Sequence, residues 1–384
     1  MEVYFDNAAT TKVSGSVIDL MVRTMQEDYG NPSSRHRKGM EAEAYVRTAA
    51  EQIAATMKVS PKNLIFTSGG AESNNMALIG TALSRQRMGR HIITTGIEHA
   101  SVYEPLGFLE SQGFEVSALS VDRQGHVDPE ELRSLIRPDT ILVSVMLINN
   151  EIGAIEPAEE LSRIIHEKNP DTWFHADAIQ AYGKMRIYPK RMGIDLLSVS
   201  GHKIHGPKGI GFLYVGDGIR LRPILYGGGQ QGGMRSGTIN VPGIAGLGLA
   251  AEEAYRTFDQ RIEAMTAVKD HLIDRVSGIE GVTVNSEKGS LGAPHIVSLS
   301  IAGVRAEVLL HTLEEKGIYV SSGSACSSHH PGISGTLKGI GLKEDLLDST
   351  IRISLNEENT KEEADYFAEQ LQDCLPLLRR FTRR

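Results

Sequence analysis

Short apolar segments alternate with helix-like segments through the first two-thirds of the chain, and this alternation constrains the fold more than any other feature. Several of the segments are apolar throughout, as strands covered on both faces are. Alternating strands and helices form a mainly parallel or mixed sheet with helices on both sides, so we predict an α/β fold. Strands are expected at residues 64–67, 91–95, 114–121, 141–148, 172–176, 194–200 and 210–215.

The pattern changes at about residue 249. A long charged helix is predicted over residues 249–276, and short strands follow at 295–301, 319–320 and 351–355. The chain is therefore expected to contain a large α/β domain and a smaller α+β domain with a cleft between them. In the segment 360–378, Cys374 is expected to fill a core, because a free cysteine behaves as a small hydrophobe. It shares helical spacing with Phe367, Leu371 and Leu378.

Composition and charge exclude several classes of protein. The 384 residues carry a formal net charge of −8 and no long run of Lys or Arg, which argues against nucleic-acid binding. The longest apolar stretch, 141–148, is far shorter than the ~20 residues that cross a bilayer. The N-terminal MEVYFDN lacks the pattern of a signal peptide, and only two cysteines are present. We therefore expect a cytoplasmic protein without a membrane partner.

Polar side chains follow several of the predicted strands. The segment SGGAESNN, 68–75, follows the first strand and opens a helix, a geometry in which backbone N–H groups bind phosphate. It is neither the GxGxxG pattern nor a Walker loop. Each polar group taken alone also occurs in ordinary turns and helix starts. The groups after the fourth, fifth and sixth predicted strands are Asn149 and Asn150, Asp177 and Gln180, and Ser200, His202 and Lys203.

Taken together, these groups match the requirements of pyridoxal 5′-phosphate. Its aldehyde needs a lysine for a Schiff base, and its pyridinium nitrogen needs a carboxylate. Its phosphate needs hydrogen-bond donors at a helix N-terminus. Lys203, Asp177 and the segment 68–75 would supply these groups at one edge of one sheet, where ligands collect in α/β folds.

A series of motifs, in order along the chain, carries a resemblance to a known family. The chain resembles the cysteine desulfurases of the NifS and IscS type, which are class V, fold-type I pyridoxal-phosphate enzymes. The resemblance implies an N-terminal arm at 1–15 that joins the small domain, a large cofactor-binding domain at 16–255 and a small C-terminal domain at 256–384. The motifs are DNAATT at 6–11, YGNPSSRH at 29–36, SGGAESNN at 68–75, IEHAS at 97–101, NNEIG at 149–153, HADAIQ at 175–180, SGHKIHGPKG at 200–209, GGGQQGGMRSGT at 227–238 and SSGSACSS at 321–328.

The resemblance assigns roles around the cofactor. Lys203 would form the Schiff base, and Asp177 would pair with the pyridine nitrogen. Gln180 would hydrogen-bond the phenolic oxygen of the ring. His99 would stack on the ring face and serve as an acid or base in the proton steps. Taken singly, a histidine such as His99 is more often packed or solvated, so this role depends on the resemblance.

The resemblance also implies which residues hold the phosphate. Thr238 would reach it from the partner subunit, which makes the protein a homodimer with shared sites. The family usually has a threonine where this chain has Ala71, and loss of that hydroxyl costs about 1 kcal/mol. We therefore expect somewhat weaker binding of the same cofactor. The phosphate ligands within one subunit would be Ser200, His202, Gly70 and Ala71.

Residues implied to bind the substrate L-cysteine come from distant parts of the chain. Asn150 would contact both cofactor and substrate, and Asn31 and His36 would contribute from the motif at 29–36. Arg352 lies between Ile351 and Ile353, so it points away from the apolar face of a strand. It is either a surface arginine or a planar fork that binds the substrate carboxylate through two parallel bonds.

Cys326 lies in SSGSACSSHH, 321–330, among small polar residues typical of a loop. The resemblance implies that Cys326 attacks the substrate sulfur and carries it as a persulfide while L-alanine leaves. A loop suits this task, because the thiol must travel from the cofactor to an acceptor. The length of the loop, through Gly335, favours a protein acceptor such as an iron–sulfur scaffold, although tRNA-thiolation and selenium pathways are also compatible.

Other functions remain open from the sequence alone. A class V aminotransferase would share the lysine and the aspartate but would not need the thiol, and a selenocysteine lyase is a further alternative. A non-catalytic sulfur-carrier scaffold would need the cysteine without Lys203, Asp177 and Gln180. Cys326 with His329 and His330 could bind a metal, but tetrahedral sites need further ligands that are not evident, so no metal is expected.

Overall fold

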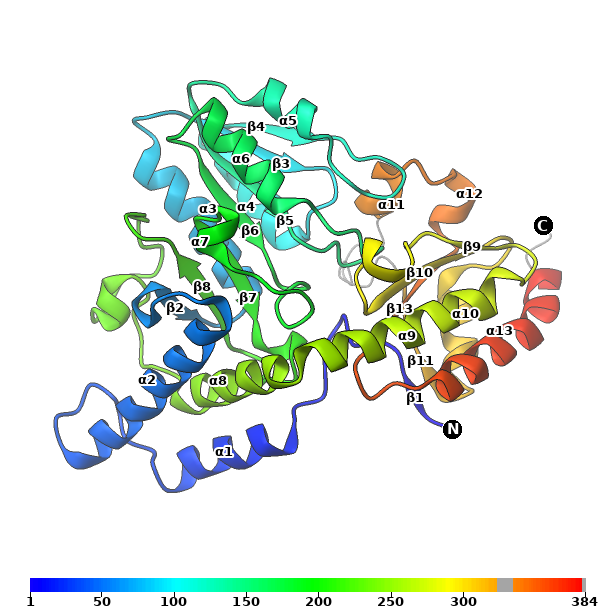
Figure 1. The fold of residues 1–384 in the computed structure, drawn as a ribbon, viewed down its shortest axis with the longest axis horizontal. Helices are drawn as coiled ribbons and strands as arrows, with labels where there is room; N and C mark the ends of the chain where they lie inside the picture. The colour runs from blue at the N-terminus through cyan, green and yellow to red at the C-terminus, as the bar shows by residue number, and fades with distance from the viewer. Residues whose placement is uncertain (323–333, 382–384) are drawn as a thin grey trace.

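The computed structural model describes residues 1–322 and 334–381. Its largest element is a seven-stranded sheet in the order β2-β8-β7-β6-β5-β3-β4 (Figure 1). β8 runs antiparallel to both of its neighbours, and the other neighbouring pairs are parallel, so the predicted mixed sheet is confirmed. The strands are β2 (Leu64–Thr67), β3 (His91–Thr95), β4 (Glu115–Leu119), β5 (Thr140–Met146), β6 (Trp173–Asp177), β7 (Leu196–Ser200) and β8 (Gly211–Val215).

Helices cover both faces of this sheet, as its apolar strands require. Leu142 of β5 packs in a cluster with α3 and α4, whereas Val143 faces the opposite way, into the main core with α2, α6 and α8. This sheet and its helices are called the large unit below. Its helices are α1 (Gly15–Gln26), α2 (Arg37–Met57), α3 (Gly70–Arg85), α4 (Ala100–Ser111), α5 (Pro129–Leu135), α6 (Ala158–Lys168), α7 (Pro189–Met192) and α8 (Val241–Arg256).

A second, antiparallel sheet of four strands forms the base of the small unit, in the order β12-β13-β10-β9. Cys374 packs against the core of this unit, as its helical spacing predicts. Across the described residues, no helix is long and apolar enough to cross a membrane. The elements are β9 (Val282–Val284), β10 (Ile296–Ile301), β12 (Ser321–Ser322), β13 (Thr350–Ser354), α9 (Phe258–Ser277), α10 (Ala306–Glu314), α11 (Gly335–Gly339), α12 (Glu344–Leu347) and α13 (Lys361–Phe381).

The prediction of one helix over residues 249–276 is wrong. The segment belongs to two helices, α8 and α9, which are separated by Thr257 with φ −119° and ψ 36°. The break lets the rings of Tyr255 and Phe258 stack with centroids 5.3 Å apart. In Figure 1, α8 runs along the large unit and α9 continues from it across the small unit, so this pair of helices links the two.

The N-terminal segment joins the two units along a second route. β1 (Val3–Tyr4) pairs in parallel with β11 (Ile318–Tyr319), and Phe5 packs edge-to-face on Phe367 of α13. The chain then crosses to the large unit, where the Thr11 N–H donates to the carbonyl of His202 at 2.8 Å. The arm therefore lies against the loop after β7. The boundaries at residues 15 and 255 stay a prediction.

Candidate active site

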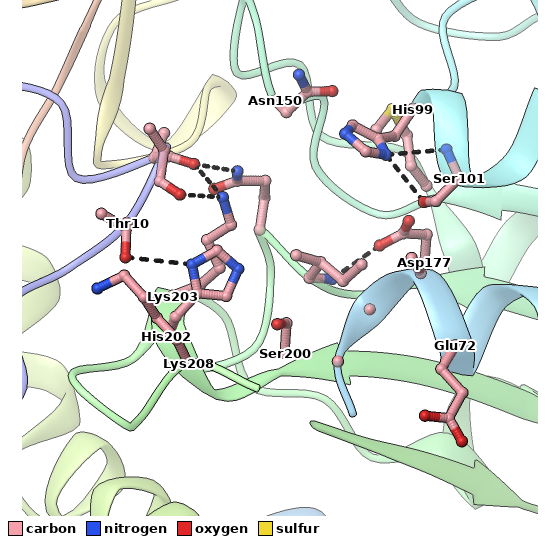
Figure 2. Close-up of a pocket in the computed structure, with 18 of the residues that line it drawn as sticks. Thr10, Glu72, His99, Ser101, Asn150, Asp177, Ser200, His202, Lys203 and Lys208 are labelled. Atoms are coloured by element: carbon pink, nitrogen blue, oxygen red, sulfur yellow. Dashed lines mark hydrogen bonds between the residues drawn. The ribbon is translucent and has the colours of Figure 1, made fainter. Parts of the chain in front are cut away.

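A cavity of about 700 Å³ lies at the carboxyl ends of β5, β6 and β7 (Figure 2). These strands are parallel neighbours, so the polar residues that follow them meet at one edge of the sheet. The volume suits a small organic ligand. The cavity is lined by ten residues to which the sequence assigned a role: Gly70, Ala71, His99, Asn150, Asp177, Gln180, Ser200, His202, Lys203 and Arg352.

Lys203 ends a short 3₁₀ turn that begins directly after β7. Its ammonium group donates to the carbonyl oxygens of Ala8 and Ala9 in the N-terminal arm, at 2.8 Å for Ala9. The adjacent His202 contacts the Thr10 hydroxyl at 3.2 Å. Burial, together with the nearby charges of Lys203 and Lys208, lowers the pKa of His202 to about 4. His202 is therefore a neutral hydrogen-bonding group at neutral pH.

Asp177 is the last residue of β6 and is almost completely buried. One carboxylate oxygen accepts from the Ile179 N–H at 2.9 Å, and the other accepts from the Asn74 amide at 2.8 Å. Burial raises the pKa of Asp177 above its ordinary value, although these two bonds oppose the rise. A cationic group placed beside this carboxylate would stabilise its charged form.

The start of α3 borders the same cavity and contains two consecutive glycines. Gly69 has φ +149°, a conformation that favours glycine. At Gly70, a Cβ atom would lie only 2.2 Å from the Cδ1 atom of Ile179, so a larger residue would require the Ile179 side chain to move. The positive end of the helix dipole and the hydroxyl of Ser200 therefore border a space suited to a phosphate.

His99 is the N-cap of α4, and its Nδ1 atom accepts from the Ser101 N–H at 3.1 Å. A neutral His99 therefore has its hydrogen on Nε2. Asn74, which the sequence analysis left without a role, donates to the Ser101 hydroxyl at 2.9 Å as well as to Asp177. A polar chain thus connects the histidine on α4 to the carboxylate on β6.

Arg352 lies in the middle of β13 with 3% of its surface exposed, so it is not a surface arginine. Its Nη1 group donates to the Asn150 carbonyl at 2.9 Å, and Nη2 donates to Asp6 at 3.1 Å. The Nε atom is buried, and no partner for it is found among the described residues. Each Nη nitrogen also has a second hydrogen, so the guanidinium group, which lines the cavity, can still bind a carboxylate.

Four predicted site residues lie elsewhere. Thr238 lines a smaller cavity, of about 230 Å³, which shares Ser68 and Gly209 with the main one. Asn31 and His36 lie in the loop between α1 and α2, where Asn31 accepts from the Ser33 N–H and His36 caps α2. Cys326 lies outside the described residues. The roles of all four residues stay predictions.

The groups around the cavity fit pyridoxal phosphate. A lysine amine, a buried carboxylate and a helix N-terminus that begins with two glycines surround one space. These are the three groups that the aldehyde, ring nitrogen and phosphate require. The two arm carbonyls that bind Lys203 are not predicted from the sequence, because any residue type supplies a carbonyl. The motif DNAATT, which contains Ala8 and Ala9, was the available signal.

Comparisons with known proteins identify the family of the chain. The model of the class-V aminotransferase family matches residues 3–367. The chain is 42% identical to the cysteine desulfurase IscS of Dictyoglomus turgidum, over 98% of this chain and 95% of that protein. Among solved structures, a NifS-like protein matches with 38% identity and a TM-score of 0.93, over 98% of this chain and 100% of that chain.

A further solved structure, described as SspA in complex with cysteine, matches with 35% identity and a TM-score of 0.82. The match covers 93% of this chain and 100% of that chain. Family model, curated relative and solved structures thus agree over nearly the whole length. The chain belongs to the class-V aminotransferase family and, within that family, to the cysteine desulfurases of the NifS and IscS type.

Proposed function

We propose that this protein is a cysteine desulfurase that uses pyridoxal 5′-phosphate to convert L-cysteine into L-alanine and transferable sulfur. The observation that carries the proposal is the meeting of Lys203, Asp177 and the N-terminus of α3 around one cavity. A sulfur-carrier scaffold would have no need of this set. The names of relatives at about 40% identity over nearly the full length further support it.

Each of the cavity residues has a different role in the proposed reaction. When bound, the cofactor supplies an electron-withdrawing ring that stabilises negative charge on the α-carbon of an amino acid. Asp177 keeps the ring nitrogen protonated, because a buried carboxylate gains most from a cationic neighbour. Lys203 exchanges its bonds to the arm carbonyls for contact with the substrate and removes the α-proton. His99 offers an Nε2–H group to the proton transfers on its side of the cavity.

Arg352 and Asn150 hold the carboxylate of the substrate. The Arg352 guanidinium is fixed by Asp6 and by the Asn150 carbonyl, which orients its planar fork before the substrate arrives. Each Nη group has a second hydrogen beyond the one given to Asn150 or Asp6, and these hydrogens are donated to the carboxylate. This recognition requires an α-carboxylate, as an amino acid has.

Cys326 receives the sulfur. Its thiolate forms a bond to the substrate sulfur while the bond from that sulfur to the β-carbon breaks, and the electron pair of the broken bond remains with the carbon fragment. That fragment takes up protons and leaves as alanine, and Cys326 retains a persulfide. The protein acts as a cytoplasmic homodimer and passes the persulfide sulfur to a protein acceptor, such as an iron–sulfur scaffold.

A covalent label tests the cofactor and its lysine. Purified protein is expected to be yellow, and borohydride is expected to bleach it and fix the cofactor on the peptide that contains Lys203. Lys203→Ala should carry no label and have no activity. Lys208→Ala is the matched control, because Lys208 lines the same cavity and should leave the label in place. A label that remains in Lys203→Ala would contradict the assignment.

Product analysis tests the reaction and the thiol. L-cysteine should yield alanine and sulfide in equal amounts when a reductant is present, whereas an aminotransferase would yield a keto acid. Cys326→Ala should keep the colour and form no persulfide. Cys374→Ala replaces the other cysteine, which packs against the core of the small unit, and should remain active. Full sulfide release by Cys326→Ala would contradict the proposed role of the thiol.

A further inference from the structure

A buried amide and a buried imidazole meet behind the cavity, and they come from different units. Gln180, after β6, lines the cavity, and 7% of its surface is exposed. Its Oε1 atom lies 3.1 Å from Nε2 of His295, and its Nε2 group donates to the Ala8 carbonyl at 3.0 Å. His295 directly precedes β10 of the small unit and is 1% exposed. The sequence analysis gave His295 no role.

Only one arrangement of hydrogens satisfies these contacts. The Ala8 carbonyl can only accept, so the Gln180 side chain must turn its NH₂ group toward Ala8 and its oxygen toward His295. His295 must then donate from Nε2. Burial, reinforced by the charges of Lys184, Lys269 and Arg352, holds the pKa of His295 well below its usual value. The ring is therefore neutral, with its one hydrogen on Nε2.

This arrangement directs one further donor. The Gln180 NH₂ group has two hydrogens, and Ala8 accepts one of them. We propose that His295 is a positioning residue, which holds the Gln180 amide so that its second hydrogen is donated to the ring oxygen of the cofactor. The inference depends on the cofactor assigned under the proposed function.

The hydrogen bond between His295 and Gln180 also connects the small unit to the proposed cofactor site. The carbonyl of His295 accepts from the Leu355 N–H at 2.8 Å, directly after β13, so the imidazole is fixed to the four-stranded sheet. Without the imidazole, the Gln180 oxygen would be buried without a donor, which is costly. The side chain would then rotate away from Ala8, and its NH₂ group would no longer be held toward the ring oxygen.

The absorption spectrum of the holoenzyme tests this role independently of turnover. A hydrogen bond donated to the ring oxygen favours its deprotonated form, so loss of that bond raises the pH midpoint at which the cofactor band changes. We expect His295→Leu and His295→Asn to raise this midpoint by about one pH unit. His295→Gln should restore it, because the glutamine nitrogen reaches the position of Nε2, whereas the asparagine nitrogen reaches only that of Nδ1.

Controls separate positioning from a general loss of packing. His91→Leu removes another buried histidine, held by Thr140 and Ser117 in the sheet, and should leave the midpoint unchanged. Gln180→Ala should raise the midpoint as His295→Asn does. The double variant that combines Gln180→Ala with His295→Asn should show no further shift. The paired Gln and Asn variants both keep a polar side chain at 295, so the comparison holds even if His295→Leu does not fold.

The outcomes distinguish this inference from the proposed function. A protein without any cofactor band would overturn both. A normal band whose midpoint is the same in the parent, His295→Asn and His295→Gln would overturn the role of His295 and leave the proposed function intact. An additional shift in the double variant would also contradict the inference, since His295 would then act on the ring by a route other than Gln180.

Discussion

Ala71 lines the cavity at the start of α3, where we propose that the phosphate binds, and the resemblance leads one to expect a threonine at this position. Its side chain is exposed at the start of α3, so a hydroxyl can be added there without displacing the core. We expect Ala71→Thr to bind the cofactor about fivefold more tightly, because a new hydrogen bond contributes about 1 kcal/mol. Equilibrium titration of the apoprotein with pyridoxal phosphate measures the change.

A matched control for Ala71→Thr is Ala55→Thr. Ala55 is an exposed alanine of α2 that does not line the cavity, so the same change there should leave the affinity unaltered. Equal affinities in the parent and Ala71→Thr would show that the added hydroxyl does not reach the phosphate.

Residues of the site differ in how well the sequence predicts them. Asp177 and Ser200 could be predicted because each ends a parallel strand, and such ends share one edge of the sheet. His295 could not be predicted, since it lies 115 positions beyond Gln180 in the sequence and contacts it only when the two units are folded. The contacts of the Ala8 and Ala9 carbonyls could not be predicted either, because every residue type has a backbone carbonyl.

At the scale of elements, strand positions were easier to predict than helix ends. β2 and β3 have the predicted bounds, because polar or turn residues flank each apolar run. The break between α8 and α9 was missed, since Thr257 lies within a continuous charged helical pattern. The position of the break depends on which unit each of the two helices packs against, and these long-range contacts cannot be read from the local sequence.

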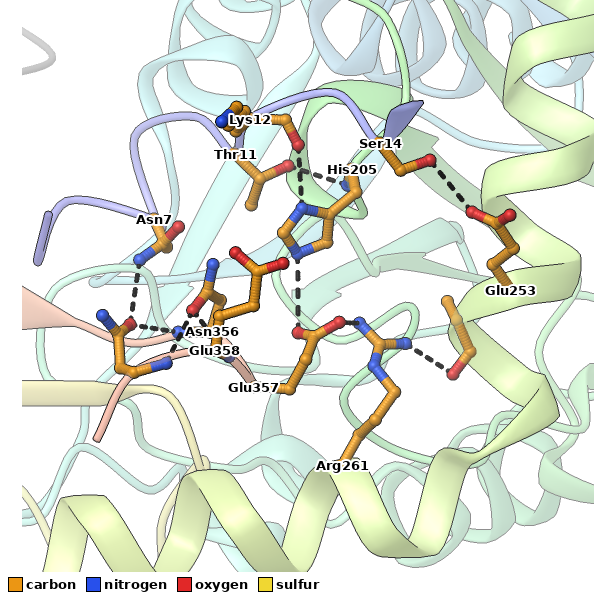
Figure 3. A network of polar contacts seen from close by, with 12 residues as sticks. Asn7, Thr11, Lys12, Ser14, His205, Glu253, Arg261, Asn356, Glu357 and Glu358 are labelled. Atoms are coloured by element: carbon orange, nitrogen blue, oxygen red, sulfur yellow. Dashed lines mark hydrogen bonds and ion pairs between the residues drawn. The ribbon is translucent and has the colours of Figure 1, made fainter. Parts of the chain in front are cut away.

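A network of polar contacts joins the elements near the break between α8 and α9 (Figure 3). Glu357, just after β13, pairs with Arg261 of α9 and lies 3.4 Å from His205, two residues beyond Lys203. His205 in turn donates to the Lys12 carbonyl of the arm at 2.8 Å. The network therefore joins the small unit, the arm and the loop of the lysine.

Burial alone would raise the pKa of Glu357, but His205 and Arg261 outweigh it and hold the pKa at about 2, below the ordinary 4.5. The carboxylate therefore stabilises the fold above pH 4.5, and this contribution is lost as the pH falls toward 2. We expect Glu357→Gln to lose about 2 kcal/mol at neutral pH. Urea unfolding across this pH range should show the difference from the parent shrinking in acid.

Glu358→Gln is the matched control for the acid-stability prediction. Glu358 is the exposed neighbour of Glu357, and its replacement should change the urea midpoint little at any pH. A difference between the parent and Glu357→Gln that stays constant from neutral pH into acid would contradict the charge-based explanation.

At the scale of the whole molecule, two features of the chain bear on the proposed homodimer. Thr238 lines the small cavity that adjoins the main one, and the bidentate pair of Arg235 with Glu72 holds its loop against the start of α3. Ile18, Val22 and Met25 form an exposed apolar stripe at helical spacing on α1. We propose that a second copy covers that stripe, in a homodimer in which Thr238 contacts the phosphate of the partner subunit.

Mixed dimers test this sharing of sites. Lys203→Ala inactivates the site of its own subunit, and Thr238→Asp places a negative charge against the phosphate of the partner's site. A dimer with one chain of each kind then has one site with both substitutions and one site with neither. Co-expression should restore about a quarter of the parent activity, because half of the dimers are mixed and each has one intact site.

The control pair is Lys203→Ala with Asp177→Asn. Both substitutions act within their own subunit, so each site of the mixed dimer carries one defect and co-expression should restore nothing. If Lys203→Ala with Thr238→Asp also restores nothing, although purification through a different affinity tag on each chain shows mixed dimers, then Thr238 acts on its own chain. The phosphate would then be bound by residues of one subunit, and a dimer formed through the apolar stripe of α1 would contain two independent sites.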